Sequence, residues 1–341
     1  MSRMLLFILP ALFAAAAALL WEPARDFLDG LQQPLQGEDR SYTKGFPNLK
    51  LNDGRYIPVV AYGLGTANSK RGGKDLDQSI INVTANALAA GFTHLDCAEA
   101  YGNEQELGAA IEASGIPREK LFITTKATVR ADQPIEENFS ASLSKLGLDY
   151  VDLYLIHSPF FTEDPKVLQA KWAEMEAIRA SGRAKSIGVS NYIQEHLDPI
   201  LETATVPPAI NQIEYHPYLQ HITQDRKTDL LAYHREKGIA VSGYGGLSAI
   251  TRAAPGPVDG KYEELAKKYN VTAADVALRW TLDTGVVAIT TSSKAERLQH
   301  YLAKLPSFKL TDDEVKEISD LGFKKHYRGF WTNQYNQDDW R

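Results

Sequence analysis

The feature that most constrains the fold is a repeated alternation of short apolar segments with longer amphipathic ones. The apolar segments fall at 59–64, 94–97, 121–125, 151–156, 186–189, 209–214, 240–243 and 286–290. Helical patterns separate them, for example at 75–90, 104–114, 135–146 and 166–181. Several of these end at a glycine typical of a helix C-terminus, as at Gly91, Gly182 and Gly238. Eight strand–helix units without long interruptions favour an α/β fold of the parallel (β/α)8 TIM-barrel type over a doubly wound sheet.

Additional segments precede the barrel pattern and interrupt or follow it. LKLNDGRYIPVV alternates around Asp53-Gly54, which predicts a β-hairpin that plugs the amino end of the barrel. Extra helical segments at 260–269 and 311–321 do not fit the simple alternation. No GxGxxG sequence opens a helix, so no motif favours the other common dinucleotide-binding fold. We therefore expect one barrel domain over residues 46–341.

The amino terminus carries an unbroken apolar run at 4–21, preceded by Arg3 and followed by Glu22. We interpret residues 1–21 as a signal or membrane-anchor segment and 22–45, rich in Pro, Gln, Gly and charge, as a linker. Positive charge before the run would hold the amino end in the cytosol, which places the domain in a lumen of the endomembrane or secretory pathway. A mispredicted gene start is the alternative, and it implies a cytoplasmic protein.

Composition excludes several classes of function. A chain of 341 residues with 44% hydrophobic content can bury one large core, and a formal net charge of −6 argues against nucleic-acid binding. Cys97 is the only cysteine, so no intrachain disulfide can form. The sequence has no Cys/His cluster spaced for zinc and no Walker-type glycine loop, so we expect no metal site. We also expect a monomer.

Chemistry-bearing side chains follow three of the predicted strands. In THLDCAEAYGNE, Asp96 ends a strand and Tyr101 lies five residues on; LFITTK and DLYLIH place Lys126 and His157 at two more strand tips. Taken alone, an exposed acid beside a packing tyrosine would explain the first motif. If the three strands share one parallel sheet, however, all four side chains converge at its carboxyl edge, where α/β folds keep their chemistry.

These four side chains suit proton donation to a carbonyl oxygen. A free tyrosine has a pKa of about 10, and a neighbouring lysine ammonium lowers it, while a carboxylate orients the lysine and keeps it charged. A neutral histidine can hydrogen-bond the substrate carbonyl. The set pairs no nucleophile with a base, so acyl transfer fits poorly. Reduction needs a hydride that no side chain supplies, so a cofactor is implied.

The later strands carry candidate cofactor contacts. Ser190 and Asn191 follow one strand and Gln212 lies in the next, where amide and hydroxyl groups suit a carboxamide such as that of nicotinamide. Satisfaction of loop backbone groups is the alternative. The next turn offers an aromatic face that can stack on a ring, over an open backbone; its candidate contacts are Tyr244, Gly245 and Leu247.

The segment TTSSKAER follows the eighth predicted strand and begins a helix. It supplies Ser292, Ser293 and Arg297, and loops at this place in barrels form the usual phosphate site. A helix cap with a solvent-exposed arginine is the alternative.

The chain resembles the aldo-keto reductase family over about residues 46–325. Three motifs in order carry the resemblance: GFTHLDCAEAYGNEQELG, KSIGVSNY and ITTSSKAERL. The resemblance implies a catalytic tetrad of Asp96, Tyr101, Lys126 and His157. It implies a nicotinamide site from Ser190, Asn191 and Gln212, with Tyr244 stacking and Asp96 adjoining. GLGT resembles the family's first cofactor-contacting loop, which adds Gly65 and Thr66.

Two departures from the family pattern bear on specificity. Thr93 stands where the family usually has arginine, which we expect to affect packing only. The last motif usually reads Ile-Pro-Lys-Ser, whereas this chain has Thr291 at the lysine position and retains Arg297. The missing lysine removes one clamp on a 2′-phosphate, so NADPH is the expected cofactor with NADH as the alternative. The Thr-Thr-Ser form resembles a fungal branch that includes ketoamide-type reductases.

The expected activity is the NAD(P)H-dependent reduction of a small aldehyde or activated ketone to an alcohol. We expect substrate contacts from His157, Phe160 and Trp331, since aromatic groups can wall an apolar pocket. A cofactor-binding sensor or regulatory subunit with little turnover is the alternative. A metal-dependent hydrolase on the same barrel would need a strand-tip pair such as HxH, which the sequence lacks.

Overall fold

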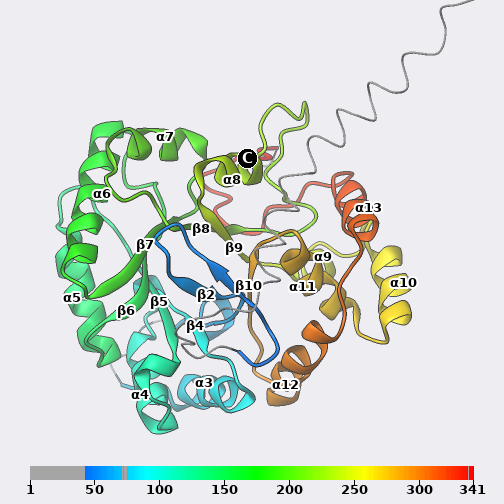
Figure 1. Cartoon of the computed structure of the whole chain (residues 1–341), viewed down its shortest axis with the longest axis horizontal. Helices are drawn as coiled ribbons and strands as arrows, with labels where there is room; N and C mark the ends of the chain where they lie inside the picture. Colours follow the sequence, from blue (N-terminus) through cyan, green and yellow to red (C-terminus); the bar gives the residue numbers. More distant parts are fainter. Residues whose placement is uncertain (1–42, 71, 73–74, 337) are drawn as a thin grey trace, which may run out of the picture.

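The computed structural model describes residues 43–341 apart from 71, 73, 74 and 337, and these form a closed barrel of parallel strands (Figure 1). The strand order is β10-β3-β4-β5-β6-β7-β8-β9, and β10 closes the barrel by pairing Ala288 with Val60 of β3. The predicted (β/α)8 barrel is confirmed. Its strands are β3 (Val60–Gly63), β4 (His94–Asp96), β5 (Phe122–Ala127), β6 (Val151–Ile156), β7 (Ala184–Ser190), β8 (Ile210–Glu214), β9 (Ala240–Tyr244) and β10 (Val287–Thr290).

The predicted signal or anchor segment at 1–21 and residues 22–42 of the predicted linker lie outside the described residues. Where the chain is described, no helix combines the length and the apolar character needed to span a bilayer. The described chain already packs on the barrel at Thr43, which is buried and shares a hydrogen bond of 3.0 Å with the hydroxyl of Thr93. Thr93 therefore contributes to packing at the start of β4, away from the carboxyl edge.

Helices surround the barrel and connect its strands (Figure 1). Those that follow strands β3 to β8 and β10 are α3 (Gln78–Ala90), α4 (Glu104–Ser114), α5 (Ile135–Leu146), α6 (Pro165–Ala180), α7 (Gln194–Thr203), α8 (Leu230–Lys237) and α12 (Ala295–Lys304). Local sequence sets their ends. Asp77 caps α3 by accepting from the Ser79 N–H, so the helix begins three residues later than predicted. Gly91 ends α3 at a φ of 109°, a left-handed conformation that costs glycine little.

The hairpin formed by β1 (Asn48–Lys50) and β2 (Tyr56–Pro58) lies across one opening of the barrel (Figure 1). Asn52 in its turn donates to the Pro208 carbonyl, and Asp53 accepts from the Ser186 hydroxyl. Pro208 precedes β8 and Ser186 lies near the start of β7, so the covered opening is the amino end. The chemistry is thereby confined to the opposite, carboxyl end.

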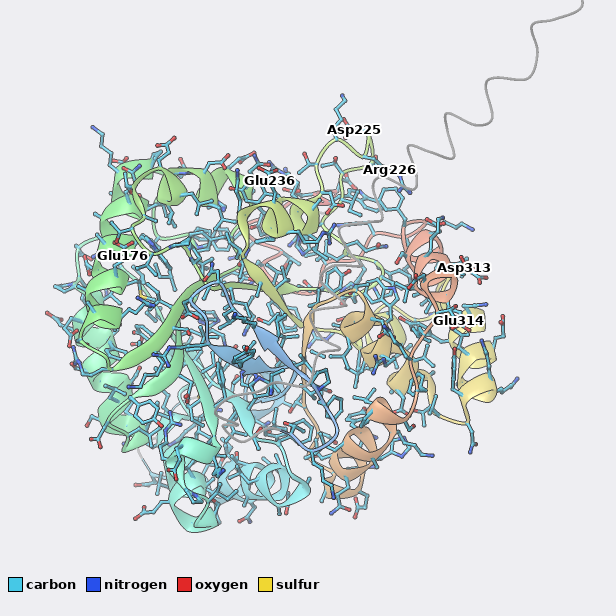
Figure 2. The ribbon with its side chains drawn as sticks, in the orientation of Figure 1. Glu176, Asp225, Arg226, Glu236, Asp313 and Glu314 are labelled. Atoms are coloured by element: carbon cyan, nitrogen blue, oxygen red, sulfur yellow. The ribbon has the colours of Figure 1, made fainter. Side chains whose placement is uncertain are left out.

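Three helices interrupt the alternation between β9 and β10, and one follows α12. They are α9 (Ser248–Thr251), α10 (Asp259–Tyr269), α11 (Ala273–Asp283) and α13 (Asp312–Gly322). The two extra helices expected from the sequence are α10 and α13, which lie outside the ring of barrel helices (Figure 1). Exposed acidic side chains such as Glu236 on α8 and Asp313 on α13 lie at the outer surface of the helices (Figure 2). A large cluster of buried apolar side chains forms the core of the described chain, and a cavity opens at the carboxyl end of the strands.

Candidate active site

Lys126 is the centre of the site. It lies inside β5, one residue beyond the predicted strand end, and its side chain is fully buried. Its ammonium donates to Asp96 Oδ1 at 2.7 Å, to the Cys97 carbonyl at 2.7 Å and to the Tyr101 hydroxyl at 3.5 Å. The pairing of adjacent strands produces this cluster, since β4 and β5 are hydrogen-bonded neighbours. A buried cation thus joins a carboxylate to a phenol.

Tyr101 ends a short 3-10 helix at Glu99–Tyr101, directly after β4. Its ring contacts the ring of His157, which follows β6, edge to face at a centroid distance of 5.5 Å. On its other side lies Gly65, where an added Cβ would come within 2.9 Å of the Tyr101 ring. Glycine is required there because any side chain would displace the phenol from Lys126.

Burial controls the protonation of these groups. It lowers the pKa of His157 to about 3, with the Lys126 charge adding to the effect, so the imidazole is neutral near pH 7. Burial also raises the pKa of Tyr101 above its ordinary value, and the nearby Lys126 charge only partly offsets this. The sequence predicted a lowered pKa for this tyrosine. The difference arises mainly because burial disfavours the charged phenolate, and Asp96, which holds Lys126, raises the pKa of Tyr101 further.

The polar groups predicted to hold a carboxamide form one connected network. Asn191 donates to the His157 carbonyl at 2.9 Å and accepts from the Tyr244 hydroxyl at 2.7 Å. Ser190 donates to the Gln212 carbonyl, and Gln212 donates to Asp96 Oδ2 at 2.7 Å. Asn191 has a φ of 62°, a conformation in which asparagine is several-fold enriched. The network ties the amide side of the site to the carboxylate that holds Lys126.

A cavity of about 610 Å³ opens above these groups. It brings together most of the residues predicted from the sequence, while Lys126 lies directly beneath it. The predicted residues that line it are Gly65, Thr66, Asp96, Tyr101, His157, Ser190, Asn191, Gln212, Tyr244, Gly245, Leu247 and Trp331.

Besides Lys126, four predicted residues do not line this cavity. Ser293 and Arg297 are exposed, and the buried Ser292 hydroxyl accepts from the Lys294 N–H at the start of α12. This bond forms a local turn before α12, and no side chain caps the helix itself. Phe160 packs 5.1 Å from the Trp331 ring. It therefore supports an aromatic wall of the cavity rather than forming one.

Sequence reasoning missed several parts of the site. Ser248, Thr251 and Arg252, in and just after α9, line the cavity, and Arg252 is the only cation among its described lining residues. Thr291, noted only as a departure from the family pattern, lines it and accepts from the Asn68 amide. The buried Glu214 at the end of β8 was also missed. A strand-tip carboxylate in INQIEYHP was the available signal.

The cavity suits a nicotinamide dinucleotide. Its volume falls within the range of small-molecule and cofactor pockets. The amide oxygen of Asn191 has a second lone pair for a carboxamide N–H, and Tyr244 lines the cavity beside it. The Thr290 hydroxyl, in the last residue of β10, is buried without a partner, so a polar group is available where the loop after β10 begins. A group of metal ligands is not found within the described ranges.

Similarity to known proteins extends over most of the chain. The model of the family described as "Aldo/keto reductase family" matches residues 60–322. A "NAD/NADP-dependent indole-3-acetaldehyde reductase" of Schizosaccharomyces pombe is 42% identical over 278 residues, 81% of this chain and 96% of that protein. A "NADPH-dependent alpha-keto amide reductase" of Saccharomyces cerevisiae is 36% identical over 301 residues, 84% of this chain and 95% of that protein.

Solved structures with a similar fold cover most of the chain. A crystal structure of an aldo-keto reductase from Bombyx mori in complex with NADP aligns with a TM-score of 0.71 and 32% identity, covering 86% of this chain and 98% of that one. An aldo/keto reductase from Brucella melitensis aligns with a TM-score of 0.69 and 33% identity, covering 81% of this chain and 99% of that one.

Proposed function

The chain belongs to the aldo/keto reductase family and is an NAD(P)-dependent oxidoreductase that acts on CH–OH groups. We propose that it reduces aldehydes or activated ketones with an apolar substituent, and that Tyr101 supplies the proton. The observation that carries the proposal is the Asp96–Lys126–Tyr101 chain at the base of the cavity, with neutral His157 beside the phenol.

In this proposal Tyr101 donates a proton to the carbonyl oxygen as the carbon is reduced. Its pKa is raised by burial, so it stays protonated until the reaction demands the proton. The oxygen of a reduced carbonyl is an alkoxide, a stronger base than a phenolate, so the transfer runs downhill. Lys126 then faces the new tyrosinate and stabilises its charge. Bound nicotinamide supplies the hydride.

His157 and Asp96 act through position and charge. The neutral imidazole can donate a hydrogen bond to the substrate carbonyl and direct it towards Tyr101. Asp96 accepts from both Lys126 and Gln212, so it holds the ammonium in one place. Together these groups fix the carbonyl in a reactive orientation, which is a large part of what a positioned site contributes.

We propose that NADPH is the preferred cofactor and that NADH is also used. Asn191 and Gln212 face the cavity with amide groups suited to the carboxamide, and Ser248 and Arg252 line the loop side with donors suited to phosphate. The retained Arg297 on α12 is the proposed contact to the 2′-phosphate. The S. pombe relative is named for both cofactors and the S. cerevisiae relative for NADPH.

The proposed substrate side is the aromatic wall of the cavity. Phe330 and Trp331 line it, and Trp331 lies 6.0 Å from His157 between ring centroids. Flat rings next to the reacting carbonyl favour a substrate with an aromatic or otherwise apolar group. The names of the two fungal relatives, for an indole aldehyde and for keto amides, are consistent with such substrates.

The test is NADPH oxidation by the purified chain against a panel of aliphatic, aromatic and α-oxo carbonyl compounds. We expect many turnovers per protein with aromatic or α-oxo substrates. Oxidation that stops at one equivalent of NADPH would contradict the reductase proposal and favour the sensor alternative. A panel without any oxidation of NADPH or NADH would contradict both the substrate class and the role of Tyr101.

A further inference from the structure

Glu214 is a buried carboxylate next to the site that the proposed reduction does not use. It is the last residue of β8 and is only 2% exposed. Its oxygens accept from the Gly329 N–H at 2.9 and 3.1 Å and from the Phe330 N–H at 3.1 Å. His216 Nε2 lies 3.1 Å from Oε1. Burying a carboxylate costs free energy unless it is hydrogen-bonded or paired with a charge. Here the two backbone amides are its main partners.

The two amides belong to the segment that closes one side of the cavity. Phe330 and Trp331 both line it. The Phe330 ring meets Tyr244 edge to face at 5.1 Å, and the Arg252 guanidinium carbon lies 4.6 Å from its centroid. Glu214 therefore binds the backbone of the C-terminal tail at the point where Phe330 and Trp331 reach the cavity.

The conformation of Trp331 also requires an external hold. Its φ is 58°, in the left-handed region that is uncommon for a bulky residue. Such a residue persists only where surrounding contacts over-determine it. Residues 332–334 beyond it are exposed, and the next contact with the barrel is the Tyr335 hydroxyl, 3.3 Å from the Asn191 carbonyl. On the amino-terminal side of Trp331, the bonds to Glu214 hold the backbone, while the Trp331 ring packs against His157 and Phe160.

We propose that Glu214 is a positioning residue for substrate selection: it fixes the segment Gly329–Trp331, and through it the aromatic wall that favours bulky apolar carbonyl substrates over small ones. The proposal rests on the carbonyl reduction proposed above. It assigns no proton or hydride transfer to Glu214. Its effect is on the fit of the part of the substrate that projects away from Tyr101.

A purely local role in the cofactor turn is the competing explanation. A Cβ added at Gly245 would lie 3.4 Å from Glu214 Cγ, so the side chain also packs beneath the turn that carries Tyr244. A role there would change cofactor affinity. A role in the tail would change discrimination between substrates and leave cofactor affinity nearly unchanged. The two explanations therefore differ in a measurable quantity.

The first test compares Glu214→Leu with Glu214→Gln in the full chain, using phenylacetaldehyde, propanal and NADPH. Leucine removes both acceptors. Glutamine with its oxygen at the Oε2 position still accepts from the Gly329 and Phe330 N–H groups, each at 3.1 Å. Its NH₂ at the Oε1 position faces His216 Nε2, which can accept if the ring proton moves to Nδ1, and it loses the shorter bond from the Gly329 N–H. We expect Glu214→Leu to lower the kcat/KM ratio of phenylacetaldehyde to propanal about ten- to a hundredfold, mainly through KM. Glu214→Gln keeps part of the contact, so its loss of discrimination should be clearly smaller than that of Glu214→Leu.

Unchanged discrimination in Glu214→Leu, or a loss of NADPH affinity as large as the loss of discrimination, would overturn the proposal. Gly329→Ala tests the same contact from the tail, should the leucine variant fail to fold. Its Cβ would lie 3.1 Å from Glu214 Oε1 and 3.2 Å from the Tyr327 ring. The same shift in discrimination is expected, and its absence would count against the proposal.

A double-mutant cycle with Trp331→Ala identifies the route of the effect. If Glu214 acts through the aromatic wall, Glu214→Leu should change the substrate ratio by less than about twofold once the indole is gone. A full effect in the Trp331→Ala background would overturn the proposal.

Limited trypsin digestion tests the anchor without any turnover. Arg328 directly precedes the gripped amides. Cleavage after it should be much faster in Glu214→Leu than in wild type or Glu214→Gln, while cleavage within the barrel stays at the wild-type rate. An unchanged rate at Arg328 would overturn the anchor. Absence of carbonyl reduction in wild type would instead overturn the proposed function, so the two failures are distinguishable.

Discussion

Two sides of the barrel rim hold the candidate site in different ways. On the side of β4 to β6, Asp96 and Lys126 are buried and bonded to each other at 2.7 Å. On the side of β10 and α12, Ser293 and Arg297 are exposed, and the pocket-lining Thr291 is half-buried and accepts from the Asn68 amide. The comparison indicates that many buried contacts fix the side chains on the proposed proton-transfer side. On the proposed cofactor-tail side, the exposed positions Ser293 and Arg297 can change at little cost to the fold.

The largest effect on stability and activity is expected from replacing Lys126 on the buried side. Lys126→Met leaves Asp96 as a buried carboxylate without its cation, which typically costs about 3–5 kcal/mol of stability. It also removes the charge that faces Tyr101, so activity at neutral pH should fall below detection. Urea unfolding and NADPH oxidation measure the two losses separately.

The pair Asp96→Asn with Lys126→Met is the matched control. It removes both charges, so most of the stability should return while activity stays lost. Recovery of activity in the pair, or a wild-type pH profile in Lys126→Met, would contradict the electrostatic role of the lysine.

The next largest effect, on turnover alone, is expected from removing the proton donor Tyr101. Tyr101→Phe keeps the ring that packs against His157 and takes away the hydroxyl near Lys126. Turnover should fall by about 10²–10⁴-fold. NADPH affinity should stay nearly unchanged, because the proton is needed only during chemistry. Single-turnover rates and cofactor titration by fluorescence check both statements, and a variant within about tenfold of wild type would remove Tyr101 from the role.

The buried side should also make the stability of the fold depend on pH, through His94. His94 lies in β4 between the Pro58 carbonyl and the Thr124 hydroxyl, and burial lowers its pKa to about 4. As pH falls through about 6.5, the unfolded chain takes up a proton that the folded His94 refuses, so stability is lost towards pH 4. His94 alone should account for about 2–3 kcal/mol between pH 7 and 4.5.

Urea unfolding of wild type and His94→Gln at these two pH values measures that contribution. Glutamine can still donate and accept in the same strand position, so it serves as a neutral replacement. The variant should lose about that much less stability on acidification. Identical pH dependence in the two proteins would show that His94 is not the buried group responsible.

On the exposed side, Arg297→Ala should weaken NADPH about ten- to a hundredfold and NADH much less. A charge-assisted hydrogen bond to phosphate nets about 1.5–3 kcal/mol, and only NADPH carries the 2′-phosphate. The fold should be unaffected, because the side chain is exposed. Affinities for both cofactors check this, with Lys309→Ala as an exposed-cation control. Equal losses for the two cofactors would place the 2′-phosphate elsewhere.

The smallest effect, on cofactor affinity, is expected from restoring at Thr291 the lysine of the family pattern. Thr291→Lys should tighten NADPH about tenfold and leave NADH unchanged, since it adds one charged donor beside the cavity. Thr291→Met is the matched control because it adds length without charge. If methionine and lysine shift NADPH equally, the gain comes from packing and the charge argument for this position is wrong.

Much of this architecture was predictable from local sequence. Apolar runs ending in Asp96, Lys126 and His157 predict parallel strands whose carboxyl ends meet, and strand pairing alone brings β4, β5 and β6 together. The hairpin at Asp53-Gly54 follows from turn chemistry in the same way. These features depend on neighbours along the chain or on adjacent strands, so periodicity and turn residues are sufficient to specify them.

Other features were decided only by the closed barrel. Gln212 reaches Asp96 across 116 residues, and Glu214 holds the tail amide of Gly329 across 115. The sequence predicted a lowered pKa for Tyr101, but burial outweighs the Lys126 charge and raises it. Desolvation and long-range hydrogen bonds depend on which segments cover a group. Local pattern determined which side chains gather at the rim, and tertiary packing determined their protonation and the wall that closes over them.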